Sequence, residues 1–227
     1  MDTSFLIPLF MASWFVQMGF HEGGHAYAAD YFGDDTARLL GKKSFNPLDH
    51  IEWNNPMSLI WSIAVPMGTA AMGMIPMGMA WVPVNPNRMK NRERAMAWVS
   101  FAGPAANLLT SVVCLVLHVL LSYFPQVNPN TVGGFGGIAG LTWLFDKLFY
   151  TVYLTSALYG VFNLIPVPPL DGSSILRYFL PRKGKELLDS IAPYGLLLVM
   201  ILFWRGPGQH VIDALFSMMN RLWFVGF

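Results

Sequence analysis

The sequence begins with a long apolar run that leads directly into a metal-binding pattern. Residues 3–20 contain no Asp, Glu, Lys or Arg, and His21-Glu22-Gly23-Gly24-His25 follows at once. Residues at i and i+4 share one face of a helix, so His21 and His25 can bind one zinc ion, with Glu22 directed at a water held there. The apolar run is long enough to lie in a bilayer, which predicts a metal site at membrane depth.

Composition is typical of a membrane protein. Of the 227 residues, 54% are hydrophobic and 12% are charged, about half the charged fraction of a soluble protein. Because one spanning helix takes about 20 apolar residues, we expect an all-α polytopic membrane protein with about 4–6 hydrophobic segments. We expect residues 1–227 to form a single domain. The net charge of +1 gives no indication of a nucleic-acid partner, and the single cysteine, Cys114, gives no disulfide framework.

Turn and breaker residues divide the apolar part of the chain. The stretch 56–87 is uncharged, but Pro66, Gly68, Gly73, Pro76 and Gly78 interrupt it, which favours a re-entrant segment over a straight span. Residues 82–86 (Val-Pro-Val-Asn-Pro) cannot be helical, and they predict a short extended or β-hairpin-like element near the active site. The expected helical segments are 4–32, 96–123, 138–165, 191–204 and 211–227.

Charged residues predict the orientation of these segments. Two basic stretches, 88–94 and 177–185, contrast with the turn 125–140, which has no charged residue. By the positive-inside rule the basic loops are cytoplasmic and the uncharged turn is external. Asp146 and Lys147 interrupt the segment 138–165, and we expect them at the membrane interface. The compact chain is compatible with a multi-pass protein of a prokaryotic inner membrane.

A third zinc ligand has to come from a distant part of the chain, because zinc in hydrolases typically takes three protein ligands and one water. Asp171 follows the run Asn163-Leu-Ile-Pro-Val-Pro-Pro-Leu170, whose prolines end any helix. A carboxylate at membrane depth costs about 2.5–3.5 kcal/mol unless it has a partner, and a bound cation would be one. The pair Asp-Gly is also common in turns. On this pattern alone, Asp171 is either a ligand or the start of a turn.

Three separated patterns occur together in one order. They are His21–His25 in the first hydrophobic segment, Gly103-Pro-Ala-Ala-Asn107 in a later one, and the run from Asn163 to Gly172. Together they resemble the site-2 protease family of intramembrane zinc metalloproteases. The stretch 32–87, with Gly33-Asp34, Asn46-Pro47 and Pro83-Val-Asn-Pro86, resembles the small branch of that family without a PDZ or CBS domain. The resemblance covers nearly the whole chain.

The resemblance implies an endopeptidase whose partner is a transmembrane helix of a protein substrate in the lipid bilayer. It implies one zinc per chain, bound by His21, His25 and Asp171, with Glu22 as the general base. Asn107 and Asn163 match family positions and are possible donors to the oxyanion or to the substrate backbone. Helix packing and a cap on the turn are their alternative roles.

Two further features leave alternatives open. Val82 and Val84 predict pairing with an extended substrate strand, and a tight turn between membrane segments is the alternative. His50 is expected to be a solvated or capping residue, and His118 a packed or interfacial one. For the whole chain the alternatives to a protease are a catalytically inactive, protease-like membrane scaffold and a metal transporter. The intact set of catalytic residues argues against the first, and the absence of repeated halves argues against the second.

Overall fold

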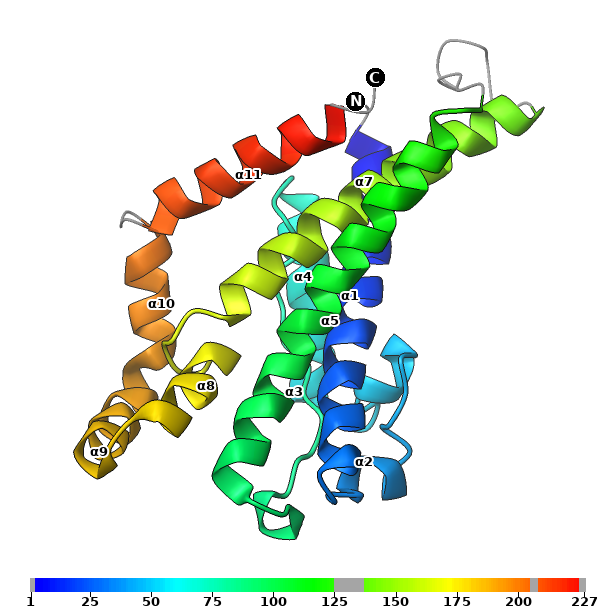
Figure 1. Ribbon diagram of the computed structural model, residues 1–227. Coiled ribbons are helices and arrows are strands. Elements are labelled where there is room, and N and C mark those ends of the chain that lie inside the picture. The colour runs from blue at the N-terminus through cyan, green and yellow to red at the C-terminus, as the bar shows by residue number, and fades with distance from the viewer. Residues whose placement is uncertain (1–2, 125–136, 205–207, 225–227) are drawn as a thin grey trace.

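The computed structural model describes residues 3–124, 137–204 and 208–224, which form helices joined by turns and extended segments. Three long helices, α1, α5 and α7, lie side by side at the centre (Figure 1). No β-strand occurs in this part of the chain. The predicted all-α fold is therefore confirmed for the described residues. The bounds of the long helices are Thr3–Tyr31 for α1, Arg92–Leu121 for α5 and Gly137–Asn163 for α7.

Helix α1 matches the predicted segment 4–32 and carries both histidines of the metal-binding pattern. It ends where Gly33 adopts a φ of 102°, a left-handed conformation that favours glycine. The backbone amide of Asp34 donates to the carbonyl of Ala29 at 2.9 Å, which closes the last turn. The helix therefore ends at Tyr31, one residue before the end of the predicted segment 4–32.

Small residues let α1 and α5 approach closely. A Cβ added at Gly24 would lie 2.7 Å from the carbonyl oxygen of Ala102 and 3.2 Å from the Cβ of Ala106. Close approach through small residues is a common way of packing helices in membranes. It places α5 directly against the turn of α1 that carries His21 and His25.

The stretch 56–87 enters as a helix and returns as an extended chain (Figure 1). The chain reverses near Gly73, whose φ is 74°. On its way back the Met79 amide donates to the Trp61 carbonyl at 3.0 Å, and the Ser62 hydroxyl donates to the Met79 carbonyl at 3.0 Å. The two arms therefore lie together, as the re-entrant prediction expects. The helical arm consists of α3 (Pro56–Leu59), η2 (Ile60–Ala64) and α4 (Val65–Ala71).

The β-hairpin-like element predicted near the active site is not seen among the described residues. Residues 82–85 are extended, as expected, but they belong to no strand. Pro83 and Pro86 have no backbone N–H and cannot donate to a strand ladder. A short 3₁₀ helix, η3 (Pro86–Arg88), follows and leads to α5.

Asp146 is buried between helices, and its position at the membrane interface stays a prediction. Its side chain is 2% exposed and packed between α7 and α5. One carboxylate oxygen lies 2.5 Å from Nδ1 of His118 on α5, and the other lies 3.0 Å from Nζ of Lys147. A buried carboxylate needs such partners. His118 is thus a packed residue, which was one of its two predicted roles.

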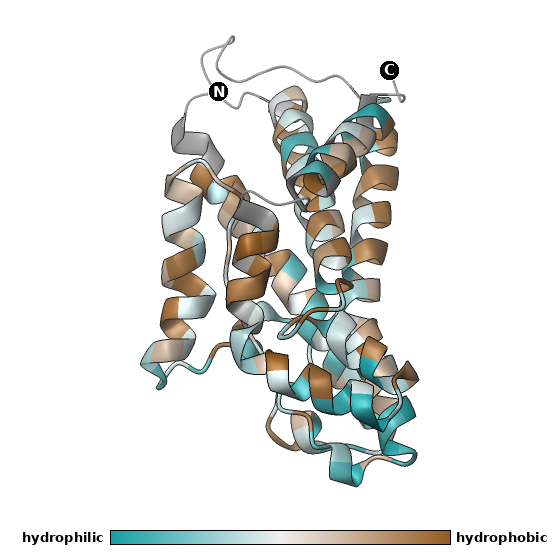
Figure 2. Cartoon of the chain, turned by 90° about the vertical axis from the view of Figure 1, so that its left-hand side faces the viewer, coloured by the Kyte–Doolittle hydropathy of each residue, from teal (hydrophilic) through white to brown (hydrophobic). Residues whose placement is uncertain are grey.

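The C-terminal part of the chain is a series of shorter helices. α8 carries Asp171, and α9 lies near the start of α5, where Lys185 Nζ is 2.5 Å from a carboxylate oxygen of Glu93. Figure 2 shows hydrophilic residues gathered at the lower end of the molecule, where these basic segments lie. The remaining helices are α2 (Thr36–Leu39), η1 (Pro47–His50), α8 (Asp171–Phe179), α9 (Arg182–Ile191), η4 (Ala192–Tyr194), α10 (Gly195–Trp204) and α11 (Gly208–Phe224).

One helix of the described residues, α5, is long and apolar enough to cross a membrane by length and composition. The number of 4–6 hydrophobic segments stays a prediction. Most of the uncharged turn at 125–140 lies outside the described residues.

Candidate metal centre

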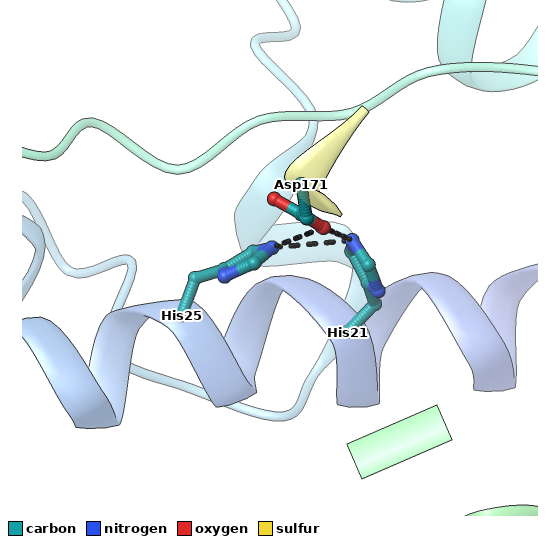
Figure 3. Close-up of side chains that lie close together, drawn as sticks. All are labelled: His21, His25 and Asp171. Atoms are coloured by element: carbon teal, nitrogen blue, oxygen red, sulfur yellow. Dashed lines mark hydrogen bonds and ion pairs between the residues drawn. The ribbon is translucent and has the colours of Figure 1, made fainter. Parts of the chain in front are cut away.

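Three side chains from two distant parts of the chain converge beside α1 (Figure 3). The Nε2 atoms of His21 and His25 are 3.2 Å apart. One carboxylate oxygen of Asp171 lies 3.3 Å from each of them. The structure therefore brings together the three residues that the sequence proposes as zinc ligands.

The spacing of these three atoms fits a zinc ion. Zinc binds histidine nitrogen and carboxylate oxygen at about 2.0–2.2 Å in a tetrahedral arrangement, whose ligand atoms are then about 3.3–3.6 Å apart. The observed separations of 3.2, 3.3 and 3.3 Å form a nearly equilateral triangle of about this size. Two imidazoles and one carboxylate also form a common donor set for catalytic zinc. The fourth corner of the tetrahedron would remain for water.

The two histidines owe their alignment to the helix and their orientation to α5. The four-residue spacing puts both rings on one face of α1. Nδ1 of His25 lies 2.7 Å from the Val99 carbonyl oxygen, so it can donate a hydrogen bond there and leave Nε2 for the metal. Gly103 is one turn further along α5. A Cβ at this position would lie 2.4 Å from His25 Nε2 and 3.0 Å from His21 Cε1.

Asp171 is the first residue of α8, directly after the proline-rich turn. Leu170 is the N-cap, and it makes no side-chain cap hydrogen bond. Gly172 is required by a close contact, because a Cβ there would lie 2.2 Å from the carbonyl oxygen of Leu164. The turn thus folds back on the end of α7 and directs the Asp171 carboxylate to the histidines. Of the two roles that the sequence left open, this geometry favours that of a ligand.

Glu22 lies beside this cluster in a buried position, with 6% of its surface exposed. Its carboxylate interacts with the backbone amide of Val82 and with the charges of His21, His25 and Asp171. It is not one of the three converging donors. A carboxylate next to the metal site, but not in it, is positioned to act on a water rather than on the metal.

The two asparagines have different surroundings. Asn107 is fully buried, and its Nδ2 lies 3.2 Å from Nδ1 of His21 and 3.3 Å from Oε1 of Gln17. Asn163 ends α7, where its Nδ2 donates to the carbonyl of Tyr159 at 3.1 Å. Asn107 therefore contacts a candidate ligand, whereas Asn163 contacts the last turn of α7.

Val82 and Val84 lie on the extended arm next to α1. Val82 is 9% exposed and packs with Ala26 of α1, and Val84 contacts the same cluster. Their side chains thus anchor the extended arm to the helix that carries Glu22. Pairing of their backbone with a substrate strand stays a prediction.

His50 is buried rather than solvated. It is 2% exposed, and its Nε2 lies 2.9 Å from the Ser44 carbonyl oxygen. Burial lowers the pKa of His50 below its ordinary value, so the ring is neutral near pH 7. It does not belong to the cluster of three donors.

Sequence reasoning missed two groups at the site, Gln17 and the Val99 carbonyl. It also missed the carboxylate of Asp34, which contacts the extended arm. Asp34 is fully buried and accepts hydrogen bonds from the Thr36 amide at 3.1 Å and the Asn85 amide at 2.5 Å. Gln17 could have been found from its position one helical turn before His21. The other two contacts have no local signal in the sequence.

Comparison of the sequence with known proteins assigns the chain to a family. The sequence model of peptidase family M50 matches residues 9–204. No solved structure matches the chain.

Several relatives of the chain are named as zinc metalloproteases. A Bacillus subtilis protein named "Putative zinc metalloprotease YwhC" is 29% identical over 91% of this chain and 85% of its own length. "Putative zinc metalloprotease Rip2" of Mycolicibacterium smegmatis is 31% identical over 86% of this chain and 66% of its own. "Zinc metalloprotease MJ0392" of Methanocaldococcus jannaschii is 26% identical over 89% of this chain and 44% of its own. The family match over most of the chain shows that this protein belongs to peptidase family M50, the site-2 protease family.

Proposed function

We propose that this protein is an intramembrane zinc metalloendopeptidase that hydrolyses a peptide bond in or near a transmembrane helix of a protein substrate. The observation that carries this proposal is the triangle of His21, His25 and Asp171 donors with the buried Glu22 carboxylate beside it. The names of the relatives support a zinc metalloprotease. The intramembrane character rests on the apolar α5 that packs directly against the site.

The donor set fits one zinc ion per chain, held by His21, His25 and Asp171. When bound, zinc would lower the pKa of a water from about 15.7 to about 7 and polarise the scissile carbonyl. Glu22 would accept the proton of this water on its carboxylate and deliver it to the nitrogen of the leaving amine. Its burial keeps the carboxylate away from bulk water.

The extended arm offers a place for substrate backbone. A substrate helix has to unwind before cleavage, because a helix engages its own amides and carbonyls. Residues 82–85 are already extended, and the Val82 amide faces Glu22. We propose that an extended substrate segment lies along Val82 and Val84 at the level of the metal. Asn163 is a further proposed substrate contact, since it ends α7 just before the turn that carries Asp171.

The membrane arrangement is proposed from charge and hydropathy. The basic segments at the start of α5 and in α9 lie at one end of the molecule (Figure 2). Basic loops favour the cytoplasmic side. We propose a multi-pass protein of a prokaryotic inner membrane, with the metal site reached from the bilayer.

The test compares wild-type protein with Glu22→Gln in liposomes. The probes are tagged single-span reporters that differ in the position of a helix-breaking Asn-Pro pair. Both proteins should contain one zinc per chain, and cleavage by the Glu22→Gln variant should fall by about 10²–10⁴-fold. Glu186→Gln is the control, because Glu186 lies on α9 in an exposed ion pair with Arg182.

Two results would contradict the proposal. Cleavage by Glu22→Gln at the wild-type rate would exclude Glu22 as the base. Wild-type protein that binds zinc and leaves every reporter intact would instead favour the inactive scaffold.

A further inference from the structure

One face of α5 contacts both histidines of the candidate metal centre. Val99, Gly103 and Asn107 are spaced four residues apart, so they follow one another along this face. The Val99 carbonyl engages Nδ1 of His25 at 2.7 Å. Gly103 leaves room for both rings. Asn107, one turn further on, faces Nδ1 of His21 at 3.2 Å. Each histidine therefore has a partner on α5 behind the nitrogen that would bind zinc.

Zinc bound at Nε2 determines what the other ring nitrogen needs. A neutral imidazole that uses Nε2 as a ligand carries its proton on Nδ1, and this N–H requires an acceptor. For His25 the acceptor is the Val99 carbonyl. For His21, in the described part of the chain, the group that lies at hydrogen-bonding distance from Nδ1 is the amide of Asn107.

The Asn107 amide can supply the missing acceptor. As drawn, its nitrogen faces His21, and its Oδ1 is buried without a hydrogen-bond partner. The two ends of an amide side chain are assigned from the surrounding hydrogen bonds. With the amide turned by 180°, Oδ1 faces His21 Nδ1 and accepts a hydrogen bond from its N–H. The side chain is fully buried, so water cannot take this place.

Gln17 fixes the Asn107 amide from the other side. It lies one turn before His21 on the same face of α1, is 3% exposed, and has Oε1 3.3 Å from Asn107 Nδ2. When Asn107 Oδ1 faces His21, the Gln17 amide also has to be turned by 180°. Its Nε2 then donates to Asn107 Oδ1. Gln17, Asn107 and His21 then form a continuous chain of side chains that ends at the metal site.

We propose that Asn107, held by Gln17, is a positioning residue that accepts a hydrogen bond from Nδ1 of His21 and so orients this histidine for zinc. The inference rests on the proposed function, because it assumes a zinc site at His21, His25 and Asp171. It replaces the contact to the oxyanion or substrate backbone that the family resemblance implies for Asn107. A side chain behind the ring of a ligand supports the ligand rather than the substrate.

The experiment measures zinc affinity by competition with a chelator for four purified variants beside the wild type. Loss of such a partner typically weakens metal binding by about 10–100-fold. We expect this loss in Asn107→Leu, which has the same branched shape and number of side-chain heavy atoms and no acceptor. A smaller loss is expected in Gln17→Leu. Asn107→Asp should bind zinc within about threefold of wild type, because a carboxylate also accepts from Nδ1.

The control is Ser111→Ala on the next turn of α5. Ser111 is buried and donates to the Tyr153 carbonyl on α7, away from the metal centre. Its zinc affinity should equal that of the wild type. If Asn107→Leu fails to fold, the contrast between Asn107→Asp and Gln17→Leu still decides the question.

Two outcomes would overturn the inference. One is wild-type zinc affinity in Asn107→Leu, and the other is an Asn107→Asp variant that binds as weakly as Asn107→Leu. Reporter cleavage separates this question from the proposed function. If the variants show the expected order of zinc affinities but the wild type cleaves no reporter, the positioning role of Asn107 is supported and the proposed protease function is contradicted. Conversely, if Asn107→Asp binds zinc as tightly as the wild type but no longer cleaves the reporters, Asn107 would be assigned to contact with the oxyanion instead.

Discussion

Glycine at position 103 decides how closely α5 can approach the candidate ligands. Any side chain there would occupy the space that the two imidazole rings now fill. The backbone of α5 can therefore reach His25 through the Val99 carbonyl. Interiors are packed as densely as organic crystals, so a single methyl group at such a contact has a measurable effect.

Gly103→Ala should abolish or strongly weaken zinc binding. Its Cβ would lie 2.4 Å from His25 Nε2 and 2.5 Å from His25 Cε1, so the rings or the helix must move. Zinc per chain, measured after purification with limiting zinc, tests this. Gly68→Ala is the matched control, because a Cβ at Gly68 meets nothing within 4 Å. Full zinc content in Gly103→Ala would show that the site relaxes without loss.

Among the elements, the extended arm is held next to α1 by the packing of Val82 and Val84 and also by one buried carboxylate. Asp34 follows the end of α1 and accepts from the Asn85 amide at 2.5 Å, and its other oxygen accepts from Thr36. The Lys90 amide also donates to the Phe32 carbonyl at 3.3 Å. Residues just after α1 therefore bind the segment between the extended arm and α5 at both of its ends, at Asn85 and at Lys90.

Asp34→Ala should loosen this arm. The change removes the charged acceptor of the Asn85 amide, and a hydrogen bond to a charged group contributes about 1.5–3 kcal/mol. We expect a lower midpoint of thermal unfolding and faster proteolysis between residues 79 and 90. Asp35→Ala is the control, because the neighbouring Asp35 makes only partly exposed ion pairs with Arg38 and Arg88, which contribute little. Equal proteolysis in the two variants would argue against a holding role for Asp34.

On the scale of the whole molecule, the metal site joins the first helix to the last third of the chain. Asp171 lies on α8, after the proline-rich turn, and its carboxylate reaches two histidines of α1. A ligand that binds only the folded protein stabilises it by mass action. Bound zinc is therefore expected to act as a link between these two regions.

Zinc should raise the unfolding temperature of the wild-type protein and not that of Asp171→Ala. At a zinc concentration 100 times the dissociation constant, the gain is about 2.7 kcal/mol. For a chain of this size that corresponds to about 5–10 °C. Thermal unfolding in detergent with zinc or with a chelator measures the difference. Asp189→Ala serves as control, since Asp189 lies on α9 and pairs with Arg177. An equal zinc effect in wild type and Asp171→Ala would assign the third ligand to another residue.

Much of this site could be predicted from local sequence. The four-residue spacing puts His21 and His25 on one face of any helix, whatever surrounds it. The prolines before Asp171 end a helix wherever they occur, because proline lacks the amide hydrogen. The expected bounds of α1 follow from similar local preferences and lie within one residue of those observed. The second long helix, α5, was expected at 96–123 and begins four residues earlier, at Arg92.

The sequence by itself therefore determined the three long helices, the pair of histidines and Asp171 as a candidate ligand. Only the tertiary structure decided that the Val99 carbonyl supports His25, that Asn107 lies behind His21, that Asp34 holds Asn85, and that Asp146 is buried against His118. These partners are 74, 86, 51 and 28 residues apart in the chain. Helix packing brings them together, and it depends on the combined fit of side chains along whole helices rather than on a pattern within one segment.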